Sequence, residues 1–140
     1  MREPVRDKGR LGHILECIDN IYEFAKGKSF EQIEKDKMCY FAIVYQLVII
    51  GEAANMLTKE FREARPQTPW REIVGMRNFV VHGYNVVDKN EVWTVIENDL
   101  SPLKTQIEGY IEELNARKND VYGGGNEGTV GGSSKVEIRE

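Results

Sequence analysis

In the middle of this 140-residue chain, the stretch from Asp36 to about Lys59 is apolar on more than one side when it is drawn as a helix. Asp36 is suited to cap the start of such a helix, because its carboxylate can accept a hydrogen bond from a free backbone N–H. A helix of this kind needs neighbours on several sides, so we expect one central helix with the rest of the chain packed around it. The small residues Gly51, Ala53 and Ala54 would let a neighbouring backbone come close. The apolar positions are Phe41, Val44, Tyr45, Leu47, Val48, Gly51, Ala54 and Met56.

The segments on both sides of this stretch repeat their apolar residues every three or four positions, which is the spacing of one helix face. Pro102 lies inside the last such segment, so a kink or a restart is expected near Leu100. The nearest strand candidate, Phe79-Val80-Val81, is short and lies inside a helical pattern. The sequence therefore predicts an all-α fold, a helical bundle of about five helices. Besides the central one, we predict helices over residues 11–25, from Ser29, from Thr68 to about Gly83, and from Asp88 to about Leu114.

Three of these helix starts carry residues that commonly cap helices. Ser29 followed by Gln32 matches a capping box, and Asp88 begins a second pattern of the same kind. Thr68 can cap its helix with Pro69 in the first position, where the missing N–H does no harm. These signals place the predicted helix starts.

The chain has the length of one domain, which we place at residues 1–120. Six of the last 20 residues are glycine and few are apolar, so residues 121–140 are predicted to be a flexible tail outside the fold. The first residues lack the apolar core of a secretory signal, and no stretch approaches the ~20 apolar residues of a membrane span. We therefore expect a cytoplasmic protein with no membrane partner.

The charge of the chain limits how it could bind nucleic acid. A net charge of −4 and a pI near 5.3 argue against a general nucleic-acid coat, which needs a positive face to displace counterions. A small local site remains compatible with these values. Between Lys59 and Arg77, five basic residues stand against three acidic ones, so the local balance is positive.

Four polar side chains that could carry chemistry, Arg77, Asn78, His82 and Tyr84, surround a short apolar run. Histidine exchanges protons near neutral pH because its ordinary pKa is about 6.5, so His82 could activate a ribose 2′-hydroxyl or protonate a leaving oxygen. Arg77 offers a rigid fork of donors to phosphate oxygens, and Asn78 could orient the imidazole or bind the phosphate. The set suits cleavage of an RNA phosphodiester without a metal or a cofactor.

The spacing of Arg77 and His82 raises a geometric problem, because on a regular helix they point about 140° apart. They could meet on one phosphate if the helix end is distorted near Gly83, or if a second copy of the chain completes the site. A homodimer would also supply a second proton-transfer group. A structural interpretation stays open beside this one: His82 caps a helix end, and Arg77 pairs with an acid on a neighbouring helix.

The segment from Arg77 to Tyr84 resembles the Arg-x4-His-x-Tyr motif of HepT-like toxins, a branch of the HEPN superfamily. The similarity runs from about Val5 to Ala116 and omits the glycine-rich tail. Three further segments resemble that family in the same order: Ile49–Ala54, Thr68–Met76 and Val92–Leu100.

This resemblance implies an antiparallel helical bundle that forms a homodimer and acts as a metal-independent endoribonuclease. Arg77 and His82 take the catalytic positions of the family, and Asn78 takes the supporting polar position. The resemblance further implies a toxin–antitoxin pair, in which a small nucleotidyltransferase acts as antitoxin by attaching AMP to Tyr84. The alternative, which the acidic pI favours, is a non-catalytic dimeric helical module that binds a nucleotidyltransferase partner or a nucleotide.

Overall fold

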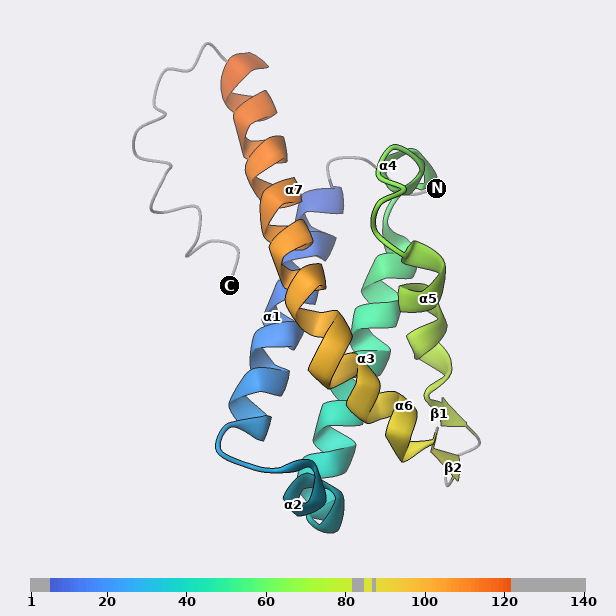
Figure 1. Ribbon diagram of the computed structural model, residues 1–140. Coiled ribbons are helices and arrows are strands. Elements are labelled where there is room, and N and C mark those ends of the chain that lie inside the picture. The colour runs from blue at the N-terminus through green and yellow to red at the C-terminus, as the bar shows by residue number, and fades with distance from the viewer. Residues whose placement is uncertain (1–5, 82–84, 87, 122–140) are drawn as a thin grey trace.

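The computed structural model describes residues 6–81, 85–86 and 88–121 of the chain. The protein is a bundle in which the long helix α1 runs opposite to the long helices α3 and α7, and the short helix α5 runs opposite to α3 (Figure 1). The predicted all-α, antiparallel bundle is confirmed. The elements are α1 (Asp7–Ala25), α2 (Phe30–Lys35), α3 (Lys37–Met56), α4 (Lys59–Glu63), α5 (Trp70–Gly75), the 3-10 turn η2 (Met76–Asn78), β1 (Val80–Val81), β2 (Asn85–Val86), α6 (Lys89–Thr94), the π-helical turn η3 (Val95–Asp99) and α7 (Leu100–Val121).

Helix α3 is the central helix that its apolar pattern predicts. It packs against α1 on one side and against α5 and η2 on another (Figure 1). The apolar side chains between the helices supply most of the favourable free energy of folding when they are buried, because the gain scales with the apolar area removed from water. The fully buried side chains of the three long helices include Leu11, Ile14, Ile18, Ile21, Ile43, Leu47, Ile50, Leu100, Ile107 and Ile111.

The starts of α2 and α3 follow the predicted capping. The Ser29 hydroxyl accepts a hydrogen bond from the Gln32 N–H at 3.1 Å, and the Gln32 side chain accepts one from the Ser29 N–H at 2.8 Å. Asp36 caps α3 by accepting from the Cys39 N–H at 3.2 Å. Gly27, just past the end of α1, has a φ of +73°, a conformation that glycine adopts without strain. These local signals therefore fix where the helices begin and end.

The end of α3 comes earlier than predicted, at Met56 rather than near Lys59. The reason is Thr58, whose hydroxyl accepts from the Phe61 N–H at 3.1 Å and so starts the short helix α4. The same hydroxyl donates to the buried Asp7 carboxylate at 2.7 Å, which links the start of α1 to this corner. The side chain that ends one helix thus begins the next.

The helix predicted from Thr68 to about Gly83 is wrong in its length. Helix α5 ends at Gly75, η2 follows, and Val80–Val81 form β1. β1 pairs in antiparallel fashion with β2, with Val80 opposite Val86 and Val81 opposite Asn85. Val80 and Val81 are β-branched, and their stiff side chains favour extended backbone over helix. The prediction that Val80 and Val81 belong to a helix is therefore wrong, while Phe79, the third residue of the strand candidate, lies before β1.

The irregularity expected from Pro102 lies one turn earlier than the proline. α7 runs without a break from Leu100 to Val121, and the π-helical turn η3 covers Val95–Asp99. A proline ring inside a helix clashes with the carbonyl four residues before it, here that of Asn98. The widened turn accommodates that clash, so the helix shifts instead of breaking.

Helix α3 also has a side that the described chain leaves uncovered. Met38, Phe41 and Tyr45 are 85%, 49% and 61% exposed, respectively. Their spacing of three and four places them on one face, which we call the α3 face. Phe41 and Tyr45 were expected to be covered by neighbouring helices, and that expectation is wrong for both. By length and composition α3 could also span a membrane, a property that it shares with core helices of globular bundles.

Candidate functional site

Arg77 lies on η2, between the end of α5 and the start of β1, with its side chain half-buried. Its Nε donates a hydrogen bond to the Val74 carbonyl oxygen at 3.2 Å. Within the part of the chain that the structure describes, no acidic side chain forms an ion pair with Arg77. Among the described residues, the two terminal nitrogens of the guanidinium group have no partner and could hold an anion, because the contact to Val74 uses only Nε.

The backbone of Arg77 rests directly on α3 at Gly51. A Cβ atom added at Gly51 would lie 2.7 Å from the Arg77 nitrogen and 3.0 Å from its Cγ. It would also lie 3.0 Å from the Ile73 carbonyl oxygen. No side chain fits at position 51, so the close approach predicted for the small residues of α3 is confirmed there. The element that meets Gly51 is the one that carries Arg77.

Asn78 follows Arg77 at the end of η2, and its side chain is exposed. Phe79, the next residue, is half-buried against the core, and its N–H donates to the Met76 carbonyl oxygen at 3.1 Å. The chain is thus held on both sides of Asn78, by Gly51 through Arg77 and by the packing of Phe79. Arg77 and Asn78 lie next to each other at a fixed place on the surface.

The other two predicted site residues, His82 and Tyr84, lie outside the described residues. In sequence they fall between β1 and β2, whose pairing places Val81 opposite Asn85. The 140° separation predicted for Arg77 and His82 assumed one helix through both, and that helix ends at Gly75. The helical angle therefore gives no argument for a second subunit.

The chain after β2 is held by contacts between α6 and α2. Lys89 at the start of α6 forms a hydrogen-bonded ion pair with Glu34 of α2. The hydrogen bond to Glu34 raises the pKa of Lys89 above its ordinary value. Trp93 stacks on Phe30 with their ring centroids 4.6 Å apart. Asp88 caps α6 by accepting from the Asn90 N–H at 2.8 Å. The β1–β2 unit is therefore anchored at α3 before it and at α2 after it.

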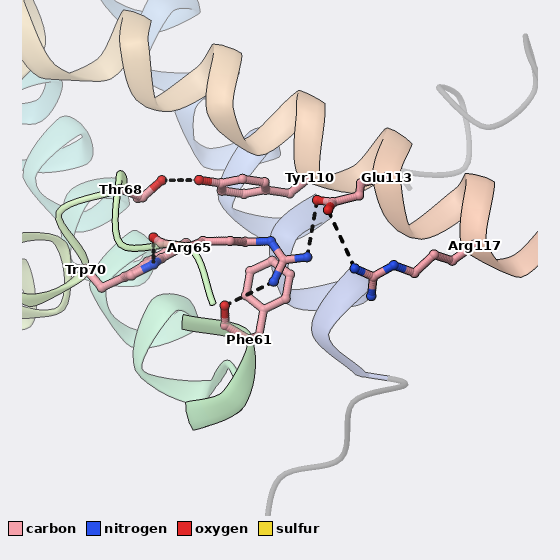
Figure 2. A network of polar contacts seen from close by, with 7 residues as sticks. All are labelled: Phe61, Arg65, Thr68, Trp70, Tyr110, Glu113 and Arg117. Atoms are coloured by element: carbon pink, nitrogen blue, oxygen red, sulfur yellow. Dashed lines mark hydrogen bonds and ion pairs between the residues drawn. The ribbon is translucent and has the colours of Figure 1, made fainter. Parts of the chain in front are cut away.

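A network around Arg65 fixes the start of α5 (Figure 2). Arg65, only 7% exposed, donates to Glu113 of α7 at 3.2 Å and to the Phe61 carbonyl oxygen at 3.1 Å. Its guanidinium carbon lies 3.8 Å from the centre of the Phe61 ring. The Arg65 carbonyl oxygen accepts from the Trp70 indole N–H at 3.0 Å. Both terminal nitrogens of Arg65 are engaged within the fold, in contrast with those of Arg77 among the described residues.

Thr68 does not cap α5 as predicted. Pro69 takes the capping position, and no side chain caps the helix. The Thr68 hydroxyl instead forms hydrogen bonds with the Tyr110 hydroxyl and with the Gln106 side chain, both on α7. The buried Tyr110 hydroxyl needs a partner in the interior, and this tertiary bond takes the place of the local cap.

The two cysteines and the acidic residues offer no further chemistry among the residues with described side chains. Burial raises the pKa of the Cys17 thiol to about 11, so this side chain stays protonated and packs in the core. The other histidine, His13, is exposed on α1. Over the described part of the chain, no three His, Cys, Asp or Glu side chains gather as metal ligands.

Two features of this site were missed in the sequence. The hairpin had a signal: two short segments rich in β-branched residues, Val80-Val81 and Asn85-Val86, separated by three residues that include Gly83. The Arg65 network had none, because Arg65 and Glu113 are far apart in sequence and meet only in the folded bundle. Only contacts within a few residues can be inferred from spacing alone.

The chain is similar to known proteins over most of its length. A family profile described as "Ribonuclease HepT-like" matches residues 14–109. A Methanocaldococcus jannaschii protein that is named as an RNase is 35% identical to this chain, over 72% of this chain and 93% of its own length. The probable ribonuclease HepT of Thermococcus cleftensis is 37% identical over 72% of this chain and 92% of its own. A second M. jannaschii protein, named as a gamma-glutamylcyclotransferase and RNase, is 38% identical over 87% of this chain but 54% of its own length. No solved structure matches the chain significantly.

Proposed function

The chain belongs to the HepT-like ribonuclease family and is an endoribonuclease, and from this premise we propose that Arg77 and His82 carry its chemistry. The observation that supports the proposal most is that the Arg77 backbone is held in place while the end of its side chain lacks a partner among the described residues. Its guanidinium group has its terminal nitrogens free of described partners, and its backbone is fixed against Gly51. An arginine held in this way is prepared to bind a phosphate, because little freedom remains to be lost on binding.

The proposed reaction is an attack of the ribose 2′-oxygen on the adjacent phosphorus. His82 accepts the proton of the 2′-hydroxyl as the new P–O bond forms. The bond to the 5′-oxygen of the next nucleotide breaks, and that oxygen takes a proton from a second acid. Arg77 stabilises the charge that grows on the non-bridging oxygens, while Asn78 binds the same phosphate or orients the imidazole. The products are a 2′,3′-cyclic phosphate and a 5′-hydroxyl end.

The need for two proton-transfer groups favours a homodimer. Each chain has one histidine in the motif, and the other histidine, His13, lies on α1, across α3 from α5 (Figure 1). The α3 face supplies a docking surface for a second copy, since three exposed large apolar side chains on one helix face are typical of an interface. Tyr45 lies about 9 Å along the axis of α3 from Gly51, so the proposed interface lies on the same helix that contacts Arg77.

The dimer proposal predicts that Tyr45→Asp combined with Phe41→Asp gives a monomer. Two carboxylates in the contact would remain unpaired when buried, which opposes association. Sedimentation equilibrium should show the wild type at twice its 16.1 kDa chain mass and the double variant at that mass. Tyr22→Asp, which replaces a partly exposed aromatic on α1, is the control and should stay dimeric. A wild type that is monomeric while it cleaves RNA would contradict the proposal.

We further propose that the enzyme is the toxin of a toxin–antitoxin pair in the cytoplasm, silenced when a partner nucleotidyltransferase adds AMP to Tyr84. Tyr84 lies two residues after His82. A nucleotide joined there by a phosphodiester brings bulk and negative charge to the place where the RNA phosphate binds. The modification therefore competes with the substrate for the Arg77 guanidinium group.

A comparison of the protein expressed alone with the protein co-expressed with its partner tests this function. The chain is expressed alone and with a nucleotidyltransferase encoded beside it, and each product is incubated with single-stranded RNA and a chelator. The chain alone should arrest growth and cleave RNA to 2′,3′-cyclic phosphate ends. After co-expression, the peptide with Tyr84 should gain mass in multiples of AMP and cleavage should be lost, whereas Tyr84→Phe should stay active. Cleavage that vanishes with the chelator contradicts the mechanism, and a chain that is harmless and inactive alone supports the non-catalytic binding module.

A further inference from the structure

We propose that Arg71 on α5 holds a second phosphate of the RNA, outside the cleaved bond, so that the strand runs along the exposed side of α5 and η2. This inference rests on the proposed function, because it extends the site at Arg77 along the same segment. It assigns a binding role to a residue outside the Arg77–Tyr84 motif.

The exposed side of α5 and η2 is continuous. Arg71, Gly75 and Asn78 are all exposed, and we call their shared surface the α5 face. The opposite side of the same segment is buried through Trp70, Ile73 and Met76. This division follows the helical repeat, in which residues three and four apart share a side. The α5 face ends at Asn78, directly beside Arg77.

Arg71 is free of acidic partners within the described part of the chain, and several other cations are not. Arg65 and Arg117 both pair with Glu113, and Lys59 pairs with Glu63. An arginine already paired with a carboxylate must lose that partner before it binds a phosphate. Arg71 and Arg77 carry no such cost, and both lie on the segment from α5 to η2.

The surface between the two arginines is open to a strand. A Cβ atom built at Gly75 would meet nothing within 4 Å, so the backbone there is uncovered. Along the axis of the segment, four residues of helical rise and two of 3-10 rise separate Arg71 from Arg77 by about 10 Å. At the ~3.4 Å rise per nucleotide of a stacked strand, this distance corresponds to about three nucleotides. Arg71 therefore binds about three nucleotides away from the cleaved phosphate.

The α5 face is also held firmly. The Trp70 indole N–H bonds to the Arg65 carbonyl oxygen at 3.0 Å, and the Thr68 hydroxyl bonds to α7 (Figure 2). These contacts fix the start of the helix that carries Arg71, so binding has to order only its side chain. Glu72, exposed on the same turn, is the one described acid within α5 and repels a passing phosphate.

The test measures RNA binding as a function of salt in a His82→Ala background, which keeps the substrate intact. The dissociation constant of a fluorescent 12-nucleotide RNA is measured at several salt concentrations. Arg71→Ala should bind about fivefold to tenfold more weakly at low salt, and its slope of log K against log salt should be shallower by about 0.7, the value for one phosphate contact on a single strand. Glu72→Gln should bind more tightly. Lys26→Ala, which removes an exposed charge at the end of α1, should match the parent.

The outcomes separate this inference from the function on which it rests. An Arg71→Ala slope equal to that of the parent overturns the inference, even if the wild type cleaves RNA. A wild type that fails to cleave RNA overturns the proposed function, and the slope of Arg71→Ala still decides whether the α5 face binds a strand. A similar loss for Lys26→Ala would show general charge attraction instead of a contact at Arg71, and would also overturn the inference.

Discussion

Replacing Arg77 with alanine should lower kcat/KM for single-stranded RNA by about 10²- to 10³-fold, the usual effect of removing one donor that stabilises transition-state charge. The terminal nitrogens of Arg77 are free of described partners in the folded protein, so their strongest interaction is expected with the phosphate itself. The same change should cost about 1 kcal/mol or less in the free energy of unfolding, because Arg77 gives up one hydrogen bond, from Nε to the Val74 carbonyl.

Two further variants make this result specific. Arg77→Lys keeps the charge but loses the planar fork, so it should recover only part of the activity. Arg117→Ala removes an exposed arginine of α7 that pairs with Glu113, and it should cleave RNA as the wild type does. Single-turnover kinetics on a short labelled RNA, together with thermal unfolding of each variant, give both quantities. An Arg77→Ala enzyme within about threefold of the wild type would show that Arg77 is structural.

The second large effect is expected at a residue that carries no functional group. Gly51→Ala should lower the rate of RNA cleavage by about 10²-fold and destabilise the fold by about 1–3 kcal/mol. The added methyl would lie 2.7 Å from the Arg77 nitrogen, closer than atoms tolerate, and the atoms that it meets are largely backbone. Either η2 or α3 must move, and Arg77 moves with η2.

Helix propensity alone predicts the opposite sign for this change, which makes the test decisive. Alanine in place of glycine within a helix favours folding by about 1 kcal/mol where the new methyl has room. Gly109→Ala on α7 is the matched control, because nothing lies within 4 Å of its Cβ position. Thermal unfolding should show Gly109→Ala stabilised and Gly51→Ala destabilised. If both variants are stabilised and both cleave RNA normally, the close approach at Gly51 does not position Arg77.

The sequence predicts the features of this fold that depend on local spacing. The central helix, the Ser29–Gln32 capping box and the Asp36 cap follow from residues within one or two turns of each other, and all three are confirmed. The family resemblance, which rests on the order of several segments, is confirmed by the profile match over residues 14–109.

The errors arise where tertiary contacts or very short elements decide the structure. Thr68 suits a cap by its type, but the buried Tyr110 hydroxyl takes its hydrogen bond. A strand of two residues such as β1 gives too little alternation to stand out against a helical pattern. The roles of Arg77 and His82, the domain boundary at residue 120 and the tail remain predictions from sequence. His82, Tyr84 and residues 122–140 of the predicted tail lie outside the described residues, while Val121 ends α7.

The contact at Gly51 couples the movement of α3 to that of η2. It joins the α3 backbone to the atoms of Arg77 with no side chain of α3 between them, so no rotamer change on α3 can absorb a displacement. Protein interiors are packed too densely to take up such a shift elsewhere at low cost. The position of Arg77 therefore depends directly on the position of α3, although Gly51 and Arg77 are far apart in sequence. We therefore expect that a partner that displaces α3 from its outward side also displaces Arg77.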